Sequence, residues 1–154
     1  MKLKTFFAAA AFIVALASCG PKEQPISEKL VGQWTGMDSI AVTVVDSTGN
    51  SVVQELVAPI ELEYLADSTF TAVITVNDST TITVGGVATV ADPAVTFTGS
   101  MTCVQSMDLS GDMKIIAEPE ALVVNFTAVN PEATVTHNGK ANLTRKVAAA
   151  VPAK

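Results

Sequence analysis

The chain has 154 residues, of which fifteen are acidic and nine are basic, and this length fits a single domain. No lysine or arginine occurs between Lys29 and Lys114, whereas ten acidic residues do. A surface this acidic repels phosphate backbones, which excludes nucleic acids as partners. Valine, threonine and isoleucine are abundant, and these β-branched residues favour strands.

The N-terminus has the pattern of an export signal. Lys2 and Lys4 precede an uncharged, apolar run of twelve residues from Phe6 to Ala17. A membrane-spanning helix needs about 20 apolar residues, so this run is too short to cross a bilayer. Its length and position are typical of the hydrophobic region of a secretory signal.

The end of this run, Leu-Ala-Ser-Cys-Gly at positions 16–20, resembles the lipobox read by lipoprotein signal peptidase. The resemblance implies that residues 1–18 are removed and that Cys19 carries diacylglycerol and usually an amide-linked acyl chain such as palmitate. Several acyl chains hold a membrane firmly, since each buried CH₂ adds about 0.8 kcal/mol. We therefore expect a Gram-negative cell-envelope lipoprotein, anchored in the outer membrane and facing the periplasm or the surface. An ordinary secretory signal that happens to contain a cysteine is the alternative.

Four segments are predicted along the chain. A short helical turn capped by Ser27 is expected just before the domain, and the alanine-rich C-terminus has no amphipathic period. The segments are a lipoprotein signal peptide (1–18), a lipidated tether (19–29), a β-domain (30–146) and a flexible tail (147–154).

Alternation of apolar and polar residues predicts eight to ten short strands. Pro59 is expected to break the ladder of its strand, and Gly85-Gly86 to permit a bend or bulge. Ser110-Gly111-Asp112 is predicted as a turn, and Asn138-Gly139 as a tight hairpin. Sequential hairpins favour an all-β, up-and-down antiparallel barrel of about eight strands, because closing the sheet removes its unpaired edges. An immunoglobulin-like β-sandwich is the alternative.

The domain begins with Gly32-Gln33-Trp34 and ends near Leu143-Thr144-Arg145-Lys146. These two stretches resemble the opening Gly-x-Trp and the last strand of lipocalins and of bacterial lipocalin-like lipoproteins. The resemblance covers most of residues 30–146 and implies that Arg145 lies over Trp34 and closes one end of the barrel. A guanidinium on an indole face gains about 0.5–2 kcal/mol.

An eight-stranded barrel is just wide enough to hold one small ligand or to be filled by its own side chains. The lipocalin resemblance favours a small hydrophobic ligand. The alternative is a filled barrel that acts as a non-catalytic structural or interaction module and meets another envelope protein. The residues expected to face inward and to line an apolar cup are Ile60, Leu62, Tyr64, Phe70, Ile74, Ile82, Val84, Val95, Phe97, Met101, Leu122, Val124 and Phe126.

The sequence predicts no enzyme, no cofactor and no metal site. His137 is the only histidine, and we expect it to be solvated beside a turn. Glu61 and Glu63 share one strand face that should point outward, whereas a glycosidase pair converges across a cleft. Cys103 has no disulfide partner if Cys19 is acylated, and it is expected to be buried as a small hydrophobe.

Asp-Ser-Thr occurs three times between predicted strands, beginning at Asp46, Asp67 and Asp78. Aspartate favours such positions because its carboxylate accepts hydrogen bonds from the backbone of a turn. With Asp38-Ser39-Ile40, these sites also resemble a signal for general O-glycosylation of exported proteins in some Gram-negative gut anaerobes. The acceptor hydroxyls would be those of Ser39, Ser47, Ser68 and Ser79.

Overall fold

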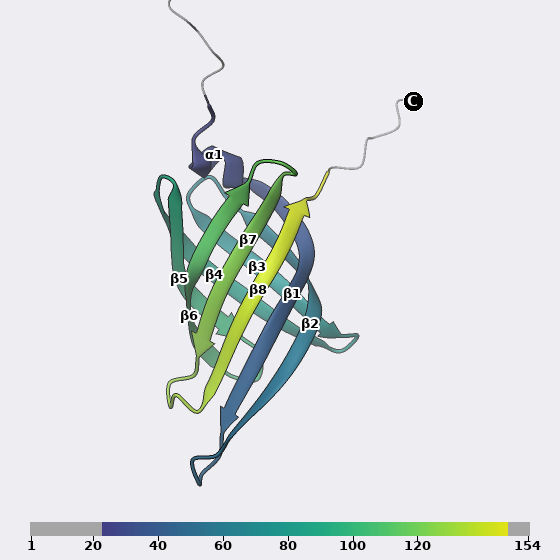
Figure 1. Cartoon of the computed structure of the whole chain (residues 1–154), viewed down its shortest axis with the longest axis vertical. Coiled ribbons are helices and arrows are strands. Elements are labelled where there is room, and N and C mark those ends of the chain that lie inside the picture. Colours follow the sequence, from purple (N-terminus) through teal and green to yellow (C-terminus); the bar gives the residue numbers. More distant parts are fainter. Residues whose placement is uncertain (1–22, 148–154) are drawn as a thin grey trace, which may run out of the picture.

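The protein forms a closed, antiparallel barrel in which eight strands follow one another in chain order and β8 pairs with β1 (Figure 1). The structure, a computed structural model, describes residues 23–147, so Cys19 and residues 148–154 lie outside it. The predicted up-and-down barrel is confirmed, and the sandwich is wrong. The elements are α1 (Ile26–Leu30), β1 (Gly32–Val45), β2 (Ser51–Tyr64), β3 (Thr69–Asn77), β4 (Thr80–Ala91), β5 (Ala94–Thr102), β6 (Ser106–Ile116), β7 (Ala121–Val129) and β8 (Val135–Arg145).

The core follows from the period of two along each strand. In β2, for example, Ile60, Leu62 and Tyr64 are buried whereas Glu61 and Glu63 are exposed. The same alternation recurs over parts of the other strands, and all thirteen residues expected to face inward are buried.

Three glycine-containing stretches predicted as turns or bends lie inside regular strands instead. Gly86 is in β4, Gly111 in β6 and Gly139 in β8. Each is paired across the sheet with a phenylalanine, in the pairs Phe70↔Gly86, Phe97↔Gly111 and Phe126↔Gly139. A methyl group on any of these glycines would run into the ring of its partner. The glycines therefore make room for inward-facing rings, a known way to cover a glycine in a sheet.

Pro59 does not interrupt β2 either. The register between β1 and β2 continues through it without a shift, with Pro59 opposite Met37. A proline is tolerated inside a strand where its nitrogen faces away from the neighbouring strand. β2 has such a free side, because it pairs with β3 only from Ile60 to Tyr64.

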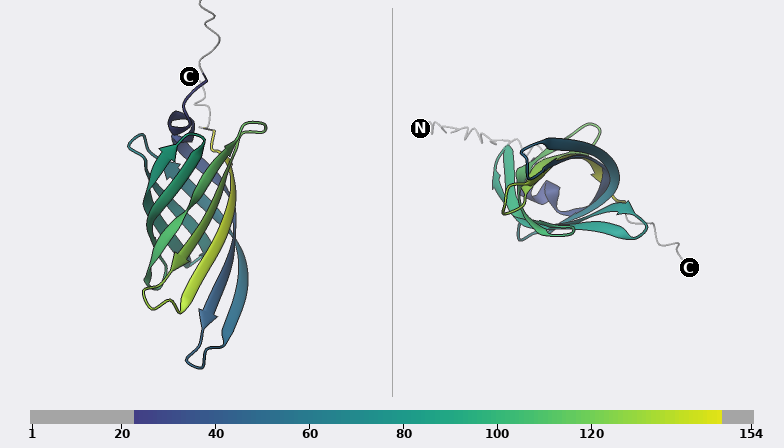
Figure 2. Two further views of the ribbon diagram at one scale, coloured as in Figure 1. Left: turned by 60° about the vertical axis from the view of Figure 1, so that its left-hand side comes forward. Right: turned by 90° about the horizontal axis from the view of Figure 1, so that it is seen from below.

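The two ends of the barrel differ. Helix α1 lies over one end (Figure 2) and buries Leu30 completely. It begins directly after Pro25, and no side chain caps it, so the predicted cap at Ser27 is wrong. At the other end, the hairpin of β1 and β2 extends beyond the neighbouring strands. Within residues 23–147, no helix is both long and apolar enough to traverse a membrane.

Candidate functional sites

The structure brings Trp34 and Arg145 together at the end covered by α1, which we call the closed end. The two residues are opposite each other in the β1–β8 register. The guanidinium carbon of Arg145 lies 4.3 Å from the centroid of the indole ring, within the range of a cation–π contact. The indole N–H of Trp34 donates a hydrogen bond of 2.8 Å to the carbonyl of Leu30.

Arg145 also holds three segments together. Its guanidinium donates to the carbonyl oxygens of Lys29 in α1 at 2.6 Å and of Val31, which directly follows α1, at 2.8 Å. It donates two further hydrogen bonds, of 3.0 and 2.9 Å, to Oε1 of Glu120 in the turn after β6. Glu120 was not foreseen from the sequence, since only the fold brings it to β8.

Replacing Arg145 by alanine should lower the free energy of unfolding by about 2 kcal/mol, because the cation–π contact and hydrogen bonds of a charged donor are lost together. Trp34 emission should shift to the red as the ring face is uncovered. Arg145→Lys should recover only part of the loss, since lysine lacks the planar fork. Denaturant titration followed by tryptophan fluorescence measures both effects. Lys146→Ala, which removes only an exposed ion pair with Glu61, is the control and should change stability little; equal effects at both positions would contradict the assignment.

The barrel interior is filled by its own side chains. The cavity among Ile60, Phe97 and Phe126 measures only about 20 Å³, enough for roughly one water molecule. The rings of Phe70 and Phe97 pack edge to face there with centroids 5.1 Å apart. Ligand pockets are typically about 300–1,000 Å³, so the residues expected to line an open cup instead form a solid core.

Asp38 is the main polar group inside this core. It is fully buried on the inward face of β1, between Ala58 of β2 and Ala141 of β8 in the register. Neither carboxyl oxygen has a hydrogen-bonding partner among the described residues. Burial raises the pKa of the carboxyl to about 6, opposed only in part by the nearby backbone N–H of Lys140. Asp38 is four residues after Trp34, and the period of two along a strand places both side chains on the same face. The sequence therefore contains a signal for its burial, but the Asp-Ser-Ile pattern points to glycosylation instead.

His137 is also inside the barrel rather than solvated beside a turn. It lies within β8, opposite Val42 of β1, and is 7% exposed. Burial lowers its pKa, and its Nδ1 atom has no hydrogen-bonding partner in residues 23–147. The described residues contain no group of three potential metal ligands.

Aspartate does shape two of the three Asp-Ser-Thr turns. Oδ1 of Asp46 accepts hydrogen bonds from the backbone of Thr48 at 2.8 Å and Asn50 at 2.9 Å, and Asp67 accepts one from Thr69 at 3.0 Å. Hydrogen bonds to the charged form lower the pKa of both carboxyls, with the hydroxyls of Thr48 and Thr69 contributing most.

The third turn is held differently, because Asn77 rather than Asp78 accepts the hydrogen bond from the backbone of Ser79, at 3.0 Å. Three of the four acceptor hydroxyls predicted for O-glycosylation belong to exposed residues, and Ser68 is half-buried. Modification at these sites stays a prediction.

The other singled-out side chains have ordinary surroundings. Cys103 follows the end of β5 and is half-buried rather than fully buried as expected, with its sulfur 3.9 Å from the carbonyl oxygen of Gln105. Glu61 and Glu63 are exposed on the outer face of β2, as expected. Oε1 of Glu61 forms an ion pair with Nζ of Lys146 at 3.0 Å.

Comparisons with known proteins support the fold. No protein-family model matches the sequence, and no curated protein matches it either. Among solved structures, a crystal structure of a mutant of the vaccine antigen Transferrin Binding Protein B from Haemophilus parasuis matches with a TM-score of 0.52 and 12% sequence identity. The match covers 82% of this chain and 29% of that chain, so this chain spans less than a third of that protein. At this identity the likeness shows the barrel fold alone.

Proposed function

We propose that this protein is an outer-membrane lipoprotein whose filled barrel is a non-catalytic interaction module of the cell envelope. The observation that carries the proposal is the solid core: the cavity of about 20 Å³ leaves no room for the small hydrophobic ligand that the lipocalin resemblance implies. Binding must then use the outer surface. The lipobox-like sequence at positions 16–20 supports the anchor.

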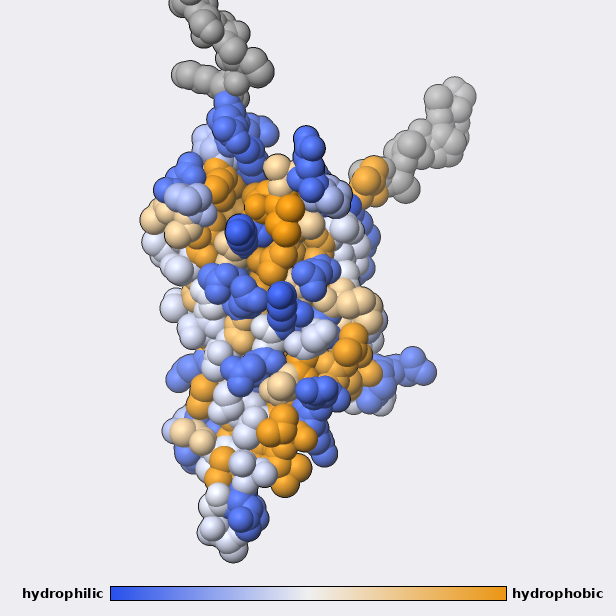
Figure 3. All heavy atoms as spheres, viewed as in Figure 1, coloured by the Kyte–Doolittle hydropathy of each residue, from blue (hydrophilic) through white to orange (hydrophobic). Residues whose placement is uncertain are grey.

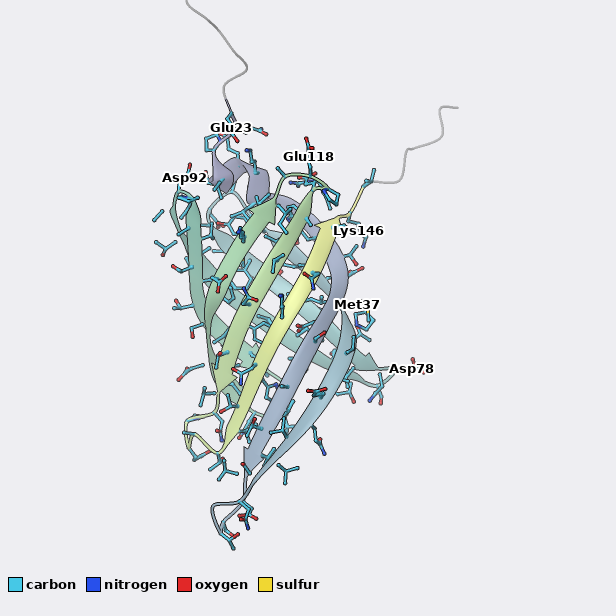
Figure 4. The ribbon with its side chains drawn as sticks, in the orientation of Figure 1. Glu23, Met37, Asp78, Asp92, Glu118 and Lys146 are labelled. Carbon is cyan, nitrogen blue, oxygen red and sulfur yellow. The ribbon has the colours of Figure 1, made fainter. Side chains whose placement is uncertain are left out.

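The position of the tether supports an orientation for the module. Glu23, the first described residue, lies beside α1 at the closed end (Figure 4). Cys19 is four residues earlier, and four residues span at most about 14 Å. The closed end therefore faces the membrane, and the hairpin of β1 and β2 points away from it.

The test is the mass of the full chain purified in mild detergent. We expect a covalently acylated chain of 136 residues, beginning at Cys19, with no non-covalent lipid retained under native mass spectrometry. Cys19→Ala should lose fatty-acid labelling and remain unprocessed at the lipobox. A stoichiometric non-covalent lipid in the wild-type protein would contradict the filled module and favour a carrier; normal labelling of Cys19→Ala would contradict the anchor.

A further inference from the structure

One half of β2 is an unpaired strand edge. β2 pairs with β1 along its whole length, but β3 pairs with it only from Ile60 onward. The hairpin of β3 and β4 turns away, carrying Asp78 to a projecting tip (Figure 4). In residues 23–147, no strand therefore pairs with the β3 side of Ser51–Pro59, which we call the open edge.

The position of Pro59 shows which backbone groups face the open edge. In an antiparallel strand, the N–H and C=O of one residue point to the same side, and those of the next point to the other. Proline has no N–H, and the β1–β2 register is unbroken at Pro59, so its nitrogen faces away from β1. Ser51, Val53, Glu55 and Val57 are the other odd-numbered residues, so they direct their N–H and C=O groups to the open edge. Val53, Glu55 and Val57 lie in the interior of this stretch.

The side chains of this edge are unusually apolar for a free strand. Val52, Val53 and Val57 are 59%, 59% and 61% exposed, and Figure 3 shows apolar surface over this lower part of the molecule. Proteins usually protect such edges with lysine, proline or a covering segment. Here the protection consists of Pro59 at one end and Glu55 in the middle.

The outer face beside the open edge is also hollowed. A shallow groove of about 380 Å³ lies over Ser39 and Ala41 of β1. Glu55 and Val57 of β2 line one side of it, and Lys140 of β8, the basic residue among its lining residues, lies on the other side of β1 from the open edge. A strand added to the edge would extend this sheet face, so its side chains would lie beside the groove.

Charge decides which occupant fits. A second copy that used all three backbone positions would place Glu55 directly opposite its own symmetry mate, and like charges directly opposite are destabilising. β2 to β5 contain no lysine or arginine, so two copies would also bring two acidic surfaces together. A segment rich in lysine or arginine would place neither a like charge opposite Glu55 nor a second acidic surface against this one.

We propose that the open edge of β2 docks an extended, lysine- or arginine-rich segment of another envelope protein, which adds a strand through the backbone of Val53, Glu55 and Val57. This inference rests on the proposed interaction function and names its site and the chemistry of its partner. Since the tether leaves from the closed end, the open edge lies on the part of the module that points away from the membrane.

The experiment uses the full chain in neutral detergent and three synthetic nine-residue peptides with blocked ends. One alternates valine and lysine, the second has glutamate in place of lysine, and the third is the lysine peptide with alternate backbone amides methylated. We expect the lysine peptide to slow hydrogen exchange of the Val53, Glu55 and Val57 amides at least ten-fold, with an affinity that falls as salt is added. The other two peptides should bind at least ten-fold more weakly.

Variants locate the site. Glu55→Pro places a second proline with the orientation of Pro59 and should abolish binding while leaving the β1–β2 ladder intact. Val57→Lys should weaken binding of the lysine peptide at least ten-fold by repulsion. Val87→Lys adds the same charge at an exposed position of β4 and should not. Because Val57→Lys keeps every backbone donor, it tests the proposal even if Glu55→Pro fails to fold.

Three results would overturn the inference: equal binding of the lysine and glutamate peptides, equal effects of Val57→Lys and Val87→Lys, or protection of the edge amides that depends on protein concentration without peptide, which would mean a second copy. None of these results changes the acyl mass or the lipid content, which test the proposed filled, lipid-anchored module. The proposed function and the docking site on the open edge can therefore be contradicted independently.

Discussion

Asp38→Asn should stabilise the protein at pH 7.5 by about 3 kcal/mol, because asparagine is isosteric with the carboxyl and carries no charge in the core. The pKa of about 6 in the folded protein lies above the ordinary aspartate value of 3.8, and each pKa unit corresponds to about 1.4 kcal/mol. The stability associated with the protonated carboxyl is fully present below about pH 3.8 and is lost as the pH rises through about 6. Above that range the native protein retains a charged carboxylate without a partner.

The measurement is the free energy of unfolding by urea at several pH values between 4 and 7.5. The difference between Asp38→Asn and the wild type should be below about 1 kcal/mol at pH 4 and grow to about 3 kcal/mol at pH 7.5. His137 has the opposite influence, since its lowered pKa removes stability as the pH falls, but it is present in both proteins and cancels. Asp108→Asn removes an equal charge from the exposed face of β6 and should show no comparable trend. A difference that does not depend on pH would contradict the buried charge.

Gly139→Ala should destabilise the barrel by about 2–3 kcal/mol, because an added methyl in a packed core forces its neighbours out of place. The new methyl group would overlap the ring of Phe126, which covers Gly139 across the β7–β8 ladder. Phe126→Leu shortens that side chain and should make Gly139→Ala less costly. In a double-mutant cycle the two changes should couple by about 1–2 kcal/mol.

Gly85→Ala is the matched control for this cycle. Gly85 lies in a strand like Gly139, but the nearest atom to an added methyl group would be the carbonyl oxygen of Phe70, at 3.9 Å. Alanine there should be neutral or slightly stabilising, because it restricts the unfolded chain. Strictly additive effects of Gly139→Ala and Phe126→Leu would show that the ring does not rest on the glycine.

The sequence predicted the barrel well where one signal acted alone. Alternation along β2 identified its inward face, and Gly-x-Trp with Arg145 identified the two strands that close the barrel. The sequence-based prediction was wrong where glycine serves two purposes. A glycine next to Asp, Asn or another Gly usually indicates a turn. At Gly86, Gly111 and Gly139, however, the glycine leaves space for a phenylalanine ring. Whether a ring lies over the glycine depends on the register of the neighbouring strand, and this register cannot be predicted from the local sequence.

The same limit applies to the candidate sites. The burial of Asp38 depends on small residues from two other strands, Ala58 and Ala141. The open edge depends on where β3 leaves β2, and the filled core on how rings from alternate strands meet. Inward positions were predictable residue by residue, whereas the volume left between them was not.

If the chain is anchored through Cys19 as proposed, Arg145 and α1 have a mechanical consequence. Any pull transmitted through the tether reaches α1 and then Gly32, the first residue of β1. β1 is hydrogen-bonded to β2 over its full length and to β8 from Trp34 to Val44, so tension along its axis shears two ladders at once instead of peeling bonds one by one. Arg145 fastens the last strand to the carbonyls of Lys29 and Val31, at the point where the load enters. Under the proposed anchor, the β1–β8 pair that closes the barrel would also be the place where the load enters and where Arg145 strengthens the structure.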